Sequence, residues 1–326
     1  MSARIAAFLL ASSVIACGAL TGCAADAVDD EELVADDGDG TSEDAIVSER
    51  QLMGNELADK TINLTFDDGP GPRTKELADF LGAEGVKATF FINGKNVPGR
   101  QAAIDAIIGR GHLLANHTHN HLQLTRQSSG TIVKEVADTD AIIVAAQPQG
   151  PFLVRAPFGA WNGSTARAIN GSSMKKYVGS VFWDVGGALT STAAADWDCW
   201  GKGVSVQRCG DLYLNEIRNK KRGIVLMHDV HGKTVDMMKN ILPVLKAEGY
   251  RFVQCDQVPA VKRALGAVGE TPSAGGCSSA TLGRSVPENA CVQSRSDQKW
   301  HRCEAGEWTS SSGANDPRCT GGKFPL

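Results

Sequence analysis

The sequence predicts an α/β protein whose main domain is a seven-stranded parallel barrel. Strand-like and helix-like patterns alternate from residue 60 to about residue 265, which is typical of a parallel sheet, either a barrel or a doubly wound layer. Reactive side chains follow five of the seven expected strands. One barrel mouth can gather all five, whereas an open sheet would spread them along an edge, so we favour the barrel.

The amino-terminal residues have the pattern of a secretion signal, 1–22, with Arg4 before an apolar run. The signal ends in Leu20-Thr-Gly-Cys23, which resembles the bacterial lipobox, where the cysteine becomes the lipidated amino terminus. An ordinary cleavage site followed by an unrelated cysteine is the alternative. We expect an exported lipoprotein of a bacterial cell envelope, held on the membrane through Cys23.

An acidic segment follows the signal and predicts a flexible tether over residues 23–57. Residues 1–49 contain 11 acidic side chains and one arginine, which leaves 32 basic and 26 acidic side chains in the rest of the chain. This slight basic excess is weak evidence for an anionic polymer as partner. We expect no nucleic-acid partner.

The barrel is expected over residues 58–265. In its first strand Ile62, Leu64 and Phe66 alternate with polar residues, as a half-buried strand should. The expected strands cover residues 62–66, 88–92, 112–115, 152–155, 178–185, 223–228 and 250–254. Apolar residues at helical spacing lie between them, for example Ile132, Val133, Val136 and Ile143.

A linker rich in glycine and small residues (266–276) separates the barrel from a Cys-rich module, 277–326. Of the nine cysteines, Cys17 belongs to the signal and Cys23 is the expected lipid site, and export makes disulfides expected among the other seven. Cys199 and Cys209 could close a short loop, and Cys255 is then the odd thiol. The module contains four further cysteines with three possible pairings: Cys277, Cys291, Cys303 and Cys319.

Two adjacent aspartates, Asp67 and Asp68, stand at the end of the first strand. Because adjacent carboxylates repel each other, a metal is the candidate to hold one of them. His117 and His121, after the third strand, would complete a set of two nitrogens and one oxygen with Asp68. Three protein ligands leave a position open for water, as catalytic zinc requires. A polar loop with incidental histidines is the alternative.

The remaining polar residues supply candidates for proton transfer. Asp67 is free to act as general base toward a metal-activated water. Arg155 could orient Asp67, or form a structural ion pair. His228, at the tip of a buried strand, is the candidate general acid, with a satisfied core histidine as the alternative. A carboxylate would stabilise its imidazolium, and Asp196 and Asp184 are both candidates.

Four motifs resemble those of carbohydrate esterase family four, the polysaccharide deacetylases of the NodB-homology type. The motifs are Thr65-Phe-Asp-Asp-Gly69, His117-Thr-His-Asn-His121, Arg155-Ala-Pro-Phe-Gly159 and Leu226-Met-His228. The resemblance covers about residues 58–262 and implies a distorted seven-stranded barrel that removes acetyl groups from sugars with a metal. It also implies that Asp67 is the base, that Asp68, His117 and His121 hold the metal, and that His228 is the acid.

Two positions depart from the family's pattern. Phe158 stands where tyrosine is usual, and its backbone N–H would still help to bind the oxyanion. The family's Asp-x-x-Asp-Trp motif is stretched by an apparent insertion before Asp196-Trp197. We assign Asp196 as the partner of His228, with Asp184 as the alternative.

Four further residues are expected on the substrate side of the site. They are Phe158 through its backbone, Leu226 of the last motif, and Trp161 and Trp197, whose rings could stack on sugars or pack internally. We expect one divalent metal, zinc first, with cobalt or nickel possible.

The expected activity is hydrolysis of N-acetyl groups on N-acetylglucosamine units of an extracytoplasmic polysaccharide, first of all peptidoglycan. Chitin oligomers and acetylated xylan are alternative substrates. A catalytically inactive carbohydrate-binding protein and a hydrolase of small cyclic amides are the competing classes. We expect a monomer.

Overall fold

The computed structural model describes residues 47–269, 276–279, 281–282, 284–294 and 297–325. The predicted signal, Cys23 and most of the predicted tether lie outside the described residues. The chain divides into units 1–40 and 41–326, and all described residues belong to the second. Among them, no helix combines the length and the apolar character needed to cross a membrane.

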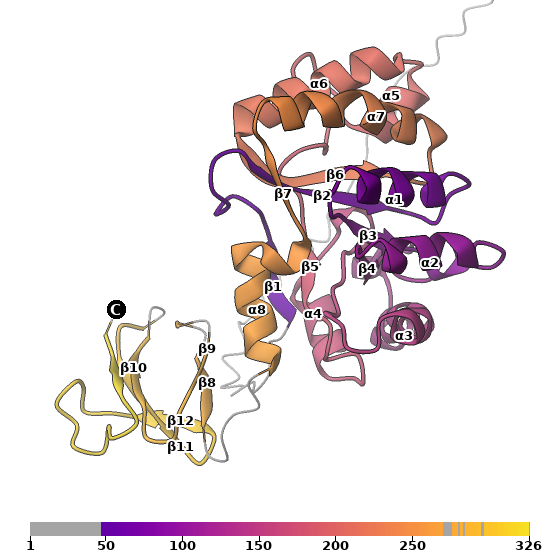
Figure 1. Ribbon diagram of the computed structural model, residues 1–326. Coiled ribbons are helices and arrows are strands. Elements are labelled where there is room, and N and C mark those ends of the chain that lie inside the picture. The colour runs from indigo at the N-terminus through magenta and orange to yellow at the C-terminus, as the bar shows by residue number, and fades with distance from the viewer. Residues whose placement is uncertain (1–46, 270–275, 280, 283, 295–296, 326) are drawn as a thin grey trace, which may run out of the picture. The chain divides into compact units, whose positions relative to one another are not determined.

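A five-stranded parallel sheet forms the centre of the second unit (Figure 1). Its hub is β2 (Thr61–Asp67), in which every residue is buried, as expected for a strand covered on both faces. One edge of β2 pairs with β6 (Arg222–His228). The other edge pairs with β3 (Thr89–Ile92) and β7 (Arg251–Val253), and β4 (Leu113–Asn116) continues the sheet beyond β3.

Two expected strands differ from the structure. Residues 152–155 form only single bridges, and the strand expected over 178–185 shortens to β5 (Gly179–Val181). Arg155 explains part of this difference, because its guanidinium donates to the carbonyl groups of Val181 and Phe182. The regular sheet is therefore a half-barrel. Its closure into seven strands stays a prediction.

The folded body begins earlier than residue 58. Strand β1 (Val47–Leu52) pairs in parallel with β5, and the carbonyl of Leu52 accepts from Phe182 N at 2.8 Å. Leu57 is buried, and its carbonyl accepts from Arg222. The prediction that the tether extends to residue 57 was therefore wrong for residues 47–57. The acidic composition that defined the tether hides β1, whose sequence Val-Ser-Glu-Arg-Gln-Leu has no apolar alternation that would mark a strand.

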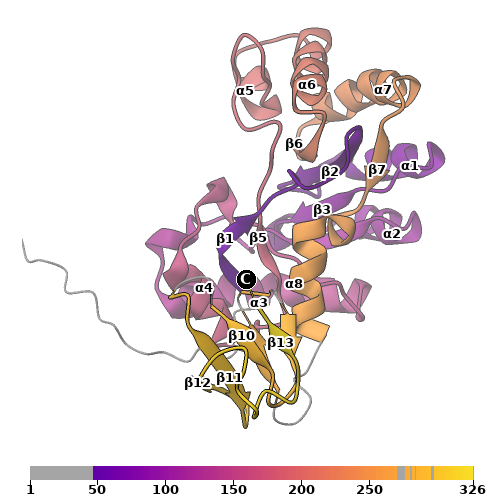
Figure 2. The same cartoon turned by 90° about the vertical axis from the view of Figure 1, so that its left-hand side faces the viewer.

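The helices follow one another around the sheet. Helices α1 to α3 stack along one side, and α6 and α7 lie beyond β6 (Figure 1). Helix α8 lies beside β1 and β5 in both views (Figures 1 and 2). Ser128, Asn162 and Ser205 cap α3, α4 and α6 through side-chain oxygens. The bounds are α1 (Thr74–Ala83), α2 (Gln101–Gly109), α3 (Ser129–Ala146), α4 (Gly163–Asn170), α5 (Asp196–Gly201), α6 (Val206–Lys220), α7 (Gly232–Ala247) and α8 (Pro259–Gly269).

The residues after α8 form small sheets with an apolar cluster of their own. Helix α8 ends at Gly269, so the first four residues of the predicted linker are helical instead. Strands β8 (Cys277–Ser279) and β9 (Arg284–Val286) form one antiparallel pair. The second sheet, in the order β12-β11-β10-β13, contains β10 (Cys291–Gln293), β11 (Trp300–Glu304), β12 (Glu307–Ser310) and β13 (Lys323–Phe324).

The disulfides resolve the pairings that the sequence left open. The Cys199–Cys209 bridge is confirmed, and Cys255 is a buried free thiol as expected. In the carboxyl-terminal region Cys277 pairs with Cys303, and Cys291 with Cys319.

Candidate metal centre and active site

The carboxyl ends of β2, β4 and β6 bring the predicted site residues to one edge of the sheet. Asp67 is the last residue of β2, and Asp68 follows it. His117 follows β4 directly, and His228 ends β6. In the parallel register of β2 and β6, Asp67 and His228 are direct partners. Parallel strands place their carboxyl ends together, which is where α/β proteins commonly bind ligands.

Asp68, His117 and His121 form a group that could hold a metal ion, because one ligand atom from each lies within 4.8 Å of the others. Asp68 Oδ1 lies 3.5 Å from His117 Nε2 and 3.2 Å from His121 Nε2. This buried Oδ1 accepts no hydrogen bond from any described residue. An unpaired buried carboxylate oxygen facing two imidazole nitrogens fits a divalent cation.

The two histidines are prepared as neutral ligands. His117 is 3% exposed, and burial lowers the pKa of its imidazole to about 3 despite the nearby Asp68. Burial also lowers the pKa of His121. His117 Nδ1 lies 2.8 Å from the carbonyl oxygen of Arg155 and donates to it, so Nε2 is left with its lone pair toward Asp68.

Asp67 lies beside the metal group and is paired with Arg155. Arg155 Nη1 donates to Asp67 Oδ1 at 2.7 Å, and Arg155 is completely buried. Its guanidinium also lies over the ring of Phe91, 4.2 Å from the centroid. Burial raises the pKa of Asp67 above its usual value, although the positive charge of Arg155 lowers that pKa in part. The carboxylate is therefore both oriented and more basic than an exposed aspartate.

The structure places Asp196, not Asp184, beside His228. Asp196 Oδ1 accepts from His228 Nδ1 at 2.7 Å, and its Oδ2 accepts from the backbone N–H of His228. Asp184 instead accepts from the backbone N–H groups of Gly54 and Ile224. Burial by itself lowers the pKa of His228, because it disfavours the charged imidazolium. The Asp196 carboxylate has the larger, opposite effect, and the pKa of His228 is raised to about 9.

Asp196 begins α5 and is held by groups that the sequence did not point to. The hydroxyl of Thr234, on α7, donates to Asp196 Oδ2 at 2.7 Å. The same Thr234 hydroxyl accepts a hydrogen bond from Trp200 Nε1. The Cys199–Cys209 bridge ties α5 to α6. Thr65 was also missed, and its hydroxyl accepts from Arg155. No pattern in a single sequence distinguishes such hydroxyl groups from surface polar residues.

The predicted substrate residues differ in exposure. Phe158 is 67% exposed, has a left-handed backbone (φ 60°), and packs its ring edge-on to His121 at 4.6 Å. Such strain in a non-glycine residue is common at functional sites. Trp197 is 49% exposed on α5. Trp161 packs against a buried apolar cluster, and Leu226 is buried with its carbonyl accepting from Tyr213.

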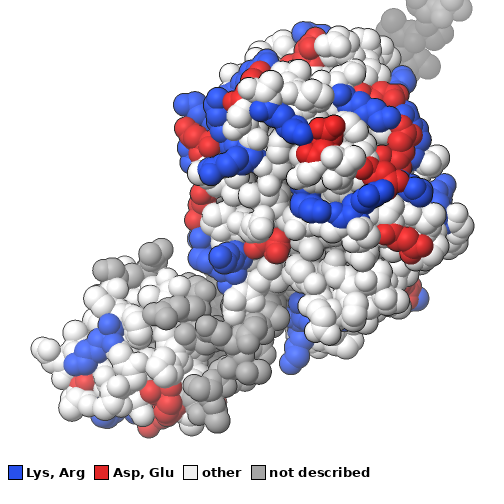
Figure 3. All heavy atoms as spheres, in the orientation of Figure 1, with Lys and Arg blue, Asp and Glu red and all other residues white. Residues whose placement is uncertain are grey.

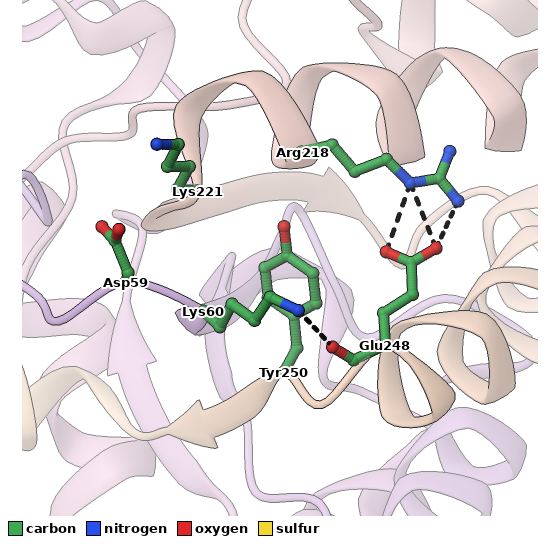
Figure 4. A pocket seen from close by; sticks show the side chains of 6 residues that line it. All are labelled: Asp59, Lys60, Arg218, Lys221, Glu248 and Tyr250. Atoms are coloured by element: carbon green, nitrogen blue, oxygen red, sulfur yellow. Dashed lines mark hydrogen bonds and ion pairs between the residues drawn. The ribbon is translucent and has the colours of Figure 1, made fainter.

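A surface pocket lies at the opposite ends of β2 and β6 (Figure 4). Lys60 donates to the Glu248 carbonyl, and Arg218 pairs with the Glu248 carboxylate, so these two cations are already engaged. The pocket is lined by Asp59, Lys60, Arg218, Lys221, Glu248 and Tyr250. Basic and acidic side chains are also interspersed over the face shown in Figure 3. Neither surface forms the single-sign field that attracts a polyanion.

Comparisons with known proteins agree with this geometry. Residues 54–176 match the family model described as polysaccharide deacetylase. The chain is 30% identical to the peptidoglycan-N-acetylglucosamine deacetylase PgdA of Listeria monocytogenes over 209 residues, which cover 64% of this chain and 40% of the relative. It is 31% identical over 207 residues to a chitooligosaccharide deacetylase of Rhizobium leguminosarum bv. trifolii, covering 59% of this chain and 88% of that one.

A solved structure is similar as well. The peptidoglycan deacetylase PdaC of Bacillus subtilis is 30% identical, with a TM-score of 0.51 over 63% of this chain and 92% of that chain. This chain spans less than half the length of the Listeria relative, but it covers most of the Rhizobium relative. The chain therefore belongs to the polysaccharide deacetylase family, carbohydrate esterase family four.

Proposed function

We propose that this protein is a metal-dependent deacetylase that hydrolyses N-acetyl groups of N-acetylglucosamine units in an extracytoplasmic polysaccharide. The observation that carries the proposal is the meeting of a metal-ligand group, a buried carboxylate and a histidine–aspartate pair at one sheet edge. Amide hydrolysis needs a proton acceptor for water, an electrophilic aid and a proton donor for the leaving amine. The site offers one candidate for each.

Asp68, His117 and His121 would hold one divalent metal. The bound metal would polarise the acetyl carbonyl and lower the pKa of the attacking water. Two neutral imidazoles and one carboxylate suit zinc, and cobalt or nickel could bind the same set.

The chain's own residues would perform the proton transfers. Asp67, oriented by Arg155, accepts a proton from the attacking water while the water oxygen forms a bond to the acetyl carbon. The Phe158 N–H donates to the oxyanion that develops. The His228 imidazolium, stabilised by Asp196, gives its proton to the nitrogen as the C–N bond breaks, so the products are acetate and a free amine.

Peptidoglycan is the first substrate choice, because several similar proteins are named peptidoglycan deacetylases. Chitin oligomers are the second choice, supported by the Rhizobium relative. Acetylated xylan is the third. A carbohydrate-binding protein without activity would need neither a buried Asp67–Arg155 pair nor a charged His228. Trp197 and Trp161 are candidates to stack on a sugar ring.

The rest of the chain fits an exported enzyme. We propose a lipoprotein signal over residues 1–22, a lipid anchor at Cys23 and a monomeric enzyme. We further propose that the half-barrel closes as a distorted seven-stranded barrel through the single bridges of Val154, Val178 and Val185. The residues after 276 would form a separate disulfide-stabilised module.

Asp67→Asn should abolish acetate release from peptidoglycan while leaving the metal content unchanged. Asparagine cannot accept the water's proton, but it fills the same space and is not among the proposed metal ligands. Acetate would be measured enzymatically on peptidoglycan, chitin oligomers and acetylated xylan, with metal content by elemental analysis. The native protein's preferred polymer identifies the substrate.

Two results would overturn parts of the proposal. Full activity of Asp67→Asn would remove the base assignment. A native protein that binds the polymers but contains no metal and releases no acetate would instead be an inactive carbohydrate-binding protein.

A further inference from the structure

The loop from His117 to His121 has an unusual backbone for a segment that contributes two metal ligands. Thr118 and His121 both have a left-handed backbone, with φ of 66° and 62°. Non-glycine residues hold such conformations only when the surrounding structure fixes them. What holds this loop therefore decides whether His117 and His121 face Asp68.

Each backbone N–H of the loop has a specific acceptor. His117 donates to the Ile92 carbonyl, and Thr118 to the side chain of Asn116. His121 donates to the Thr118 hydroxyl. The backbone N–H groups of His119 and Asn120 both donate to one residue of α3, Glu135. His119 donates to its backbone carbonyl at 2.9 Å, and Asn120 donates to its carboxylate at 2.7 Å.

The opposite side of the loop is also fixed. Gly94 N and Lys95 N donate to the carbonyl groups of Thr118 and His119, and Lys95 Nζ donates to that of Asn120. The loop thus lies in a clamp between the 3₁₀ turn Gly94–Asn96 and α3. On the α3 side, the Glu135 carboxylate is the only side-chain acceptor for Asn120 among the described residues.

Glu135 is itself an unusual residue for its position. Its side chain is 4% exposed on the apolar face of α3. Its two oxygens accept from the backbone N–H and the side-chain amide of Asn120, both at 2.7 Å, and no described cationic side chain pairs with it. Burying a carboxylate without a counter-ion is costly, and a leucine would serve helix packing better. We therefore attribute the presence of this carboxylate to its hydrogen bonds with Asn120 of the loop.

We propose that Glu135 is a positioning residue of the metal centre. Its carboxylate holds Asn120, and through it the His117–His121 loop, in the conformation that aims both imidazoles at Asp68. The hydrogen bonds of Glu135 to this loop are with the backbone of His119 and with Asn120, not with the ring nitrogens of His117 and His121. The inference rests on the proposed function, since the metal belongs to that proposal.

The test compares zinc affinity in three purified variants at Glu135 and its surroundings. Glu135→Leu removes both acceptors, and we expect the zinc dissociation constant to rise about tenfold, the lower end for outer-shell partners of metal sites. Glu135→Gln keeps one acceptor for the Asn120 N–H and should bind zinc nearly as the native protein does. Asp138→Asn removes a partly exposed carboxylate of the same helix, which pairs with Lys134 and not with the loop, and should leave zinc affinity unchanged.

Zinc affinity would be measured by competition with a chromophoric chelator, together with the thermal midpoint of the metal-free protein. A merely structural role would lower that midpoint and leave the dissociation constant unchanged. If Glu135→Leu does not fold, Asn120→Ala decides. This exposed residue loses only its amide bond to Glu135, and it should weaken zinc binding in the same direction but less.

The outcomes separate this inference from the proposed function. Native-like zinc affinity in folded Glu135→Leu, or in Asn120→Ala where Glu135→Leu does not fold, would overturn the role of Glu135 and leave the deacetylase proposal intact. A native protein that binds no zinc, cobalt or nickel would overturn the metal centre, and the inference with it.

Discussion

His228 and Asp196 show how one buried pair sets the working pH of a site. With a pKa of about 9, His228 is an imidazolium at neutral pH and can donate a proton. We expect the turnover number to fall as pH rises through about 9, because the acid is then lost. The raised pKa of His228 also stabilises the fold: while Asp196 is ionised, this contribution is complete below the unfolded pKa of histidine, about 6.5, and is lost as pH rises through about 9.

A matched variant isolates the role of the carboxylate. Asp196→Asn removes the charge that raises the pKa of His228, so the alkaline limb of the activity profile should move to lower pH. Acetate release measured from pH 6 to 11, at saturating metal, checks this. An alkaline limb that stays in place would assign it to another group.

At the residue scale, the sequence predicted groups that lie in contiguous motifs and missed groups that meet only in the fold. Asp67, Asp68, His117 and His121 stand next to strand ends, so their meeting could be predicted. Thr234 and Glu135 lie on helices, and only the packing of α7 and α3 against the sheet edge brings their oxygens to Asp196 and Asn120. The single signal for Glu135 is a charged residue within an apolar helical stripe.

At the scale of elements, α5 carries Asp196 and is tied to α6 by the Cys199–Cys209 bridge. Replacing both cysteines with serine should lower the free energy of unfolding by about 2–3 kcal/mol, because the closed loop spans 10 residues of sequence separation. The turnover number should also fall, since α5 would hold Asp196 less firmly. Denaturant unfolding and acetate release measure the two effects.

Cys255→Ser provides the control for loss of a cysteine. Cys255 is buried, and its thiol donates to Asn63 Oδ1, far along the chain from α5. It should leave the turnover number unchanged. If the double serine variant lost stability but kept full turnover, the hydrogen bonds of Thr234 and His228 to Asp196 would suffice to hold α5.

The strands illustrate what periodicity can predict. Strands β2, β3, β4, β6 and β7 were predicted because apolar runs of the right length mark them. Strands were also expected over residues 152–155 and 178–185, but the structure has only single bridges and the short β5 there, in part because Arg155 occupies carbonyl groups that a longer strand would pair. A buried arginine that replaces strand hydrogen bonds leaves no periodic trace in the sequence.

At the scale of the whole molecule, the core and the carboxyl-terminal residues have separate apolar clusters and separate disulfides. A protein ending at residue 269 should therefore fold and release acetate from soluble chitin oligomers at the native rate. Circular dichroism and the acetate assay check this. Aggregation or loss of activity would show that residues after 269 complete the fold.

The proposed base and acid, Asp67 and His228, are register partners on neighbouring strands. Their backbones are therefore separated by one interstrand spacing, about 4.8 Å, which the sheet itself enforces. A slip of one residue in either strand would turn that strand's side chain, Asp67 or His228, to the opposite face, so we expect a mispaired chain to lose the proposed activity outright rather than gradually. The connecting segments take no part in this spacing. Insertions such as the one before α5 can thus reshape the rim during evolution, while the distance between the two proton-transfer groups is inherited unchanged.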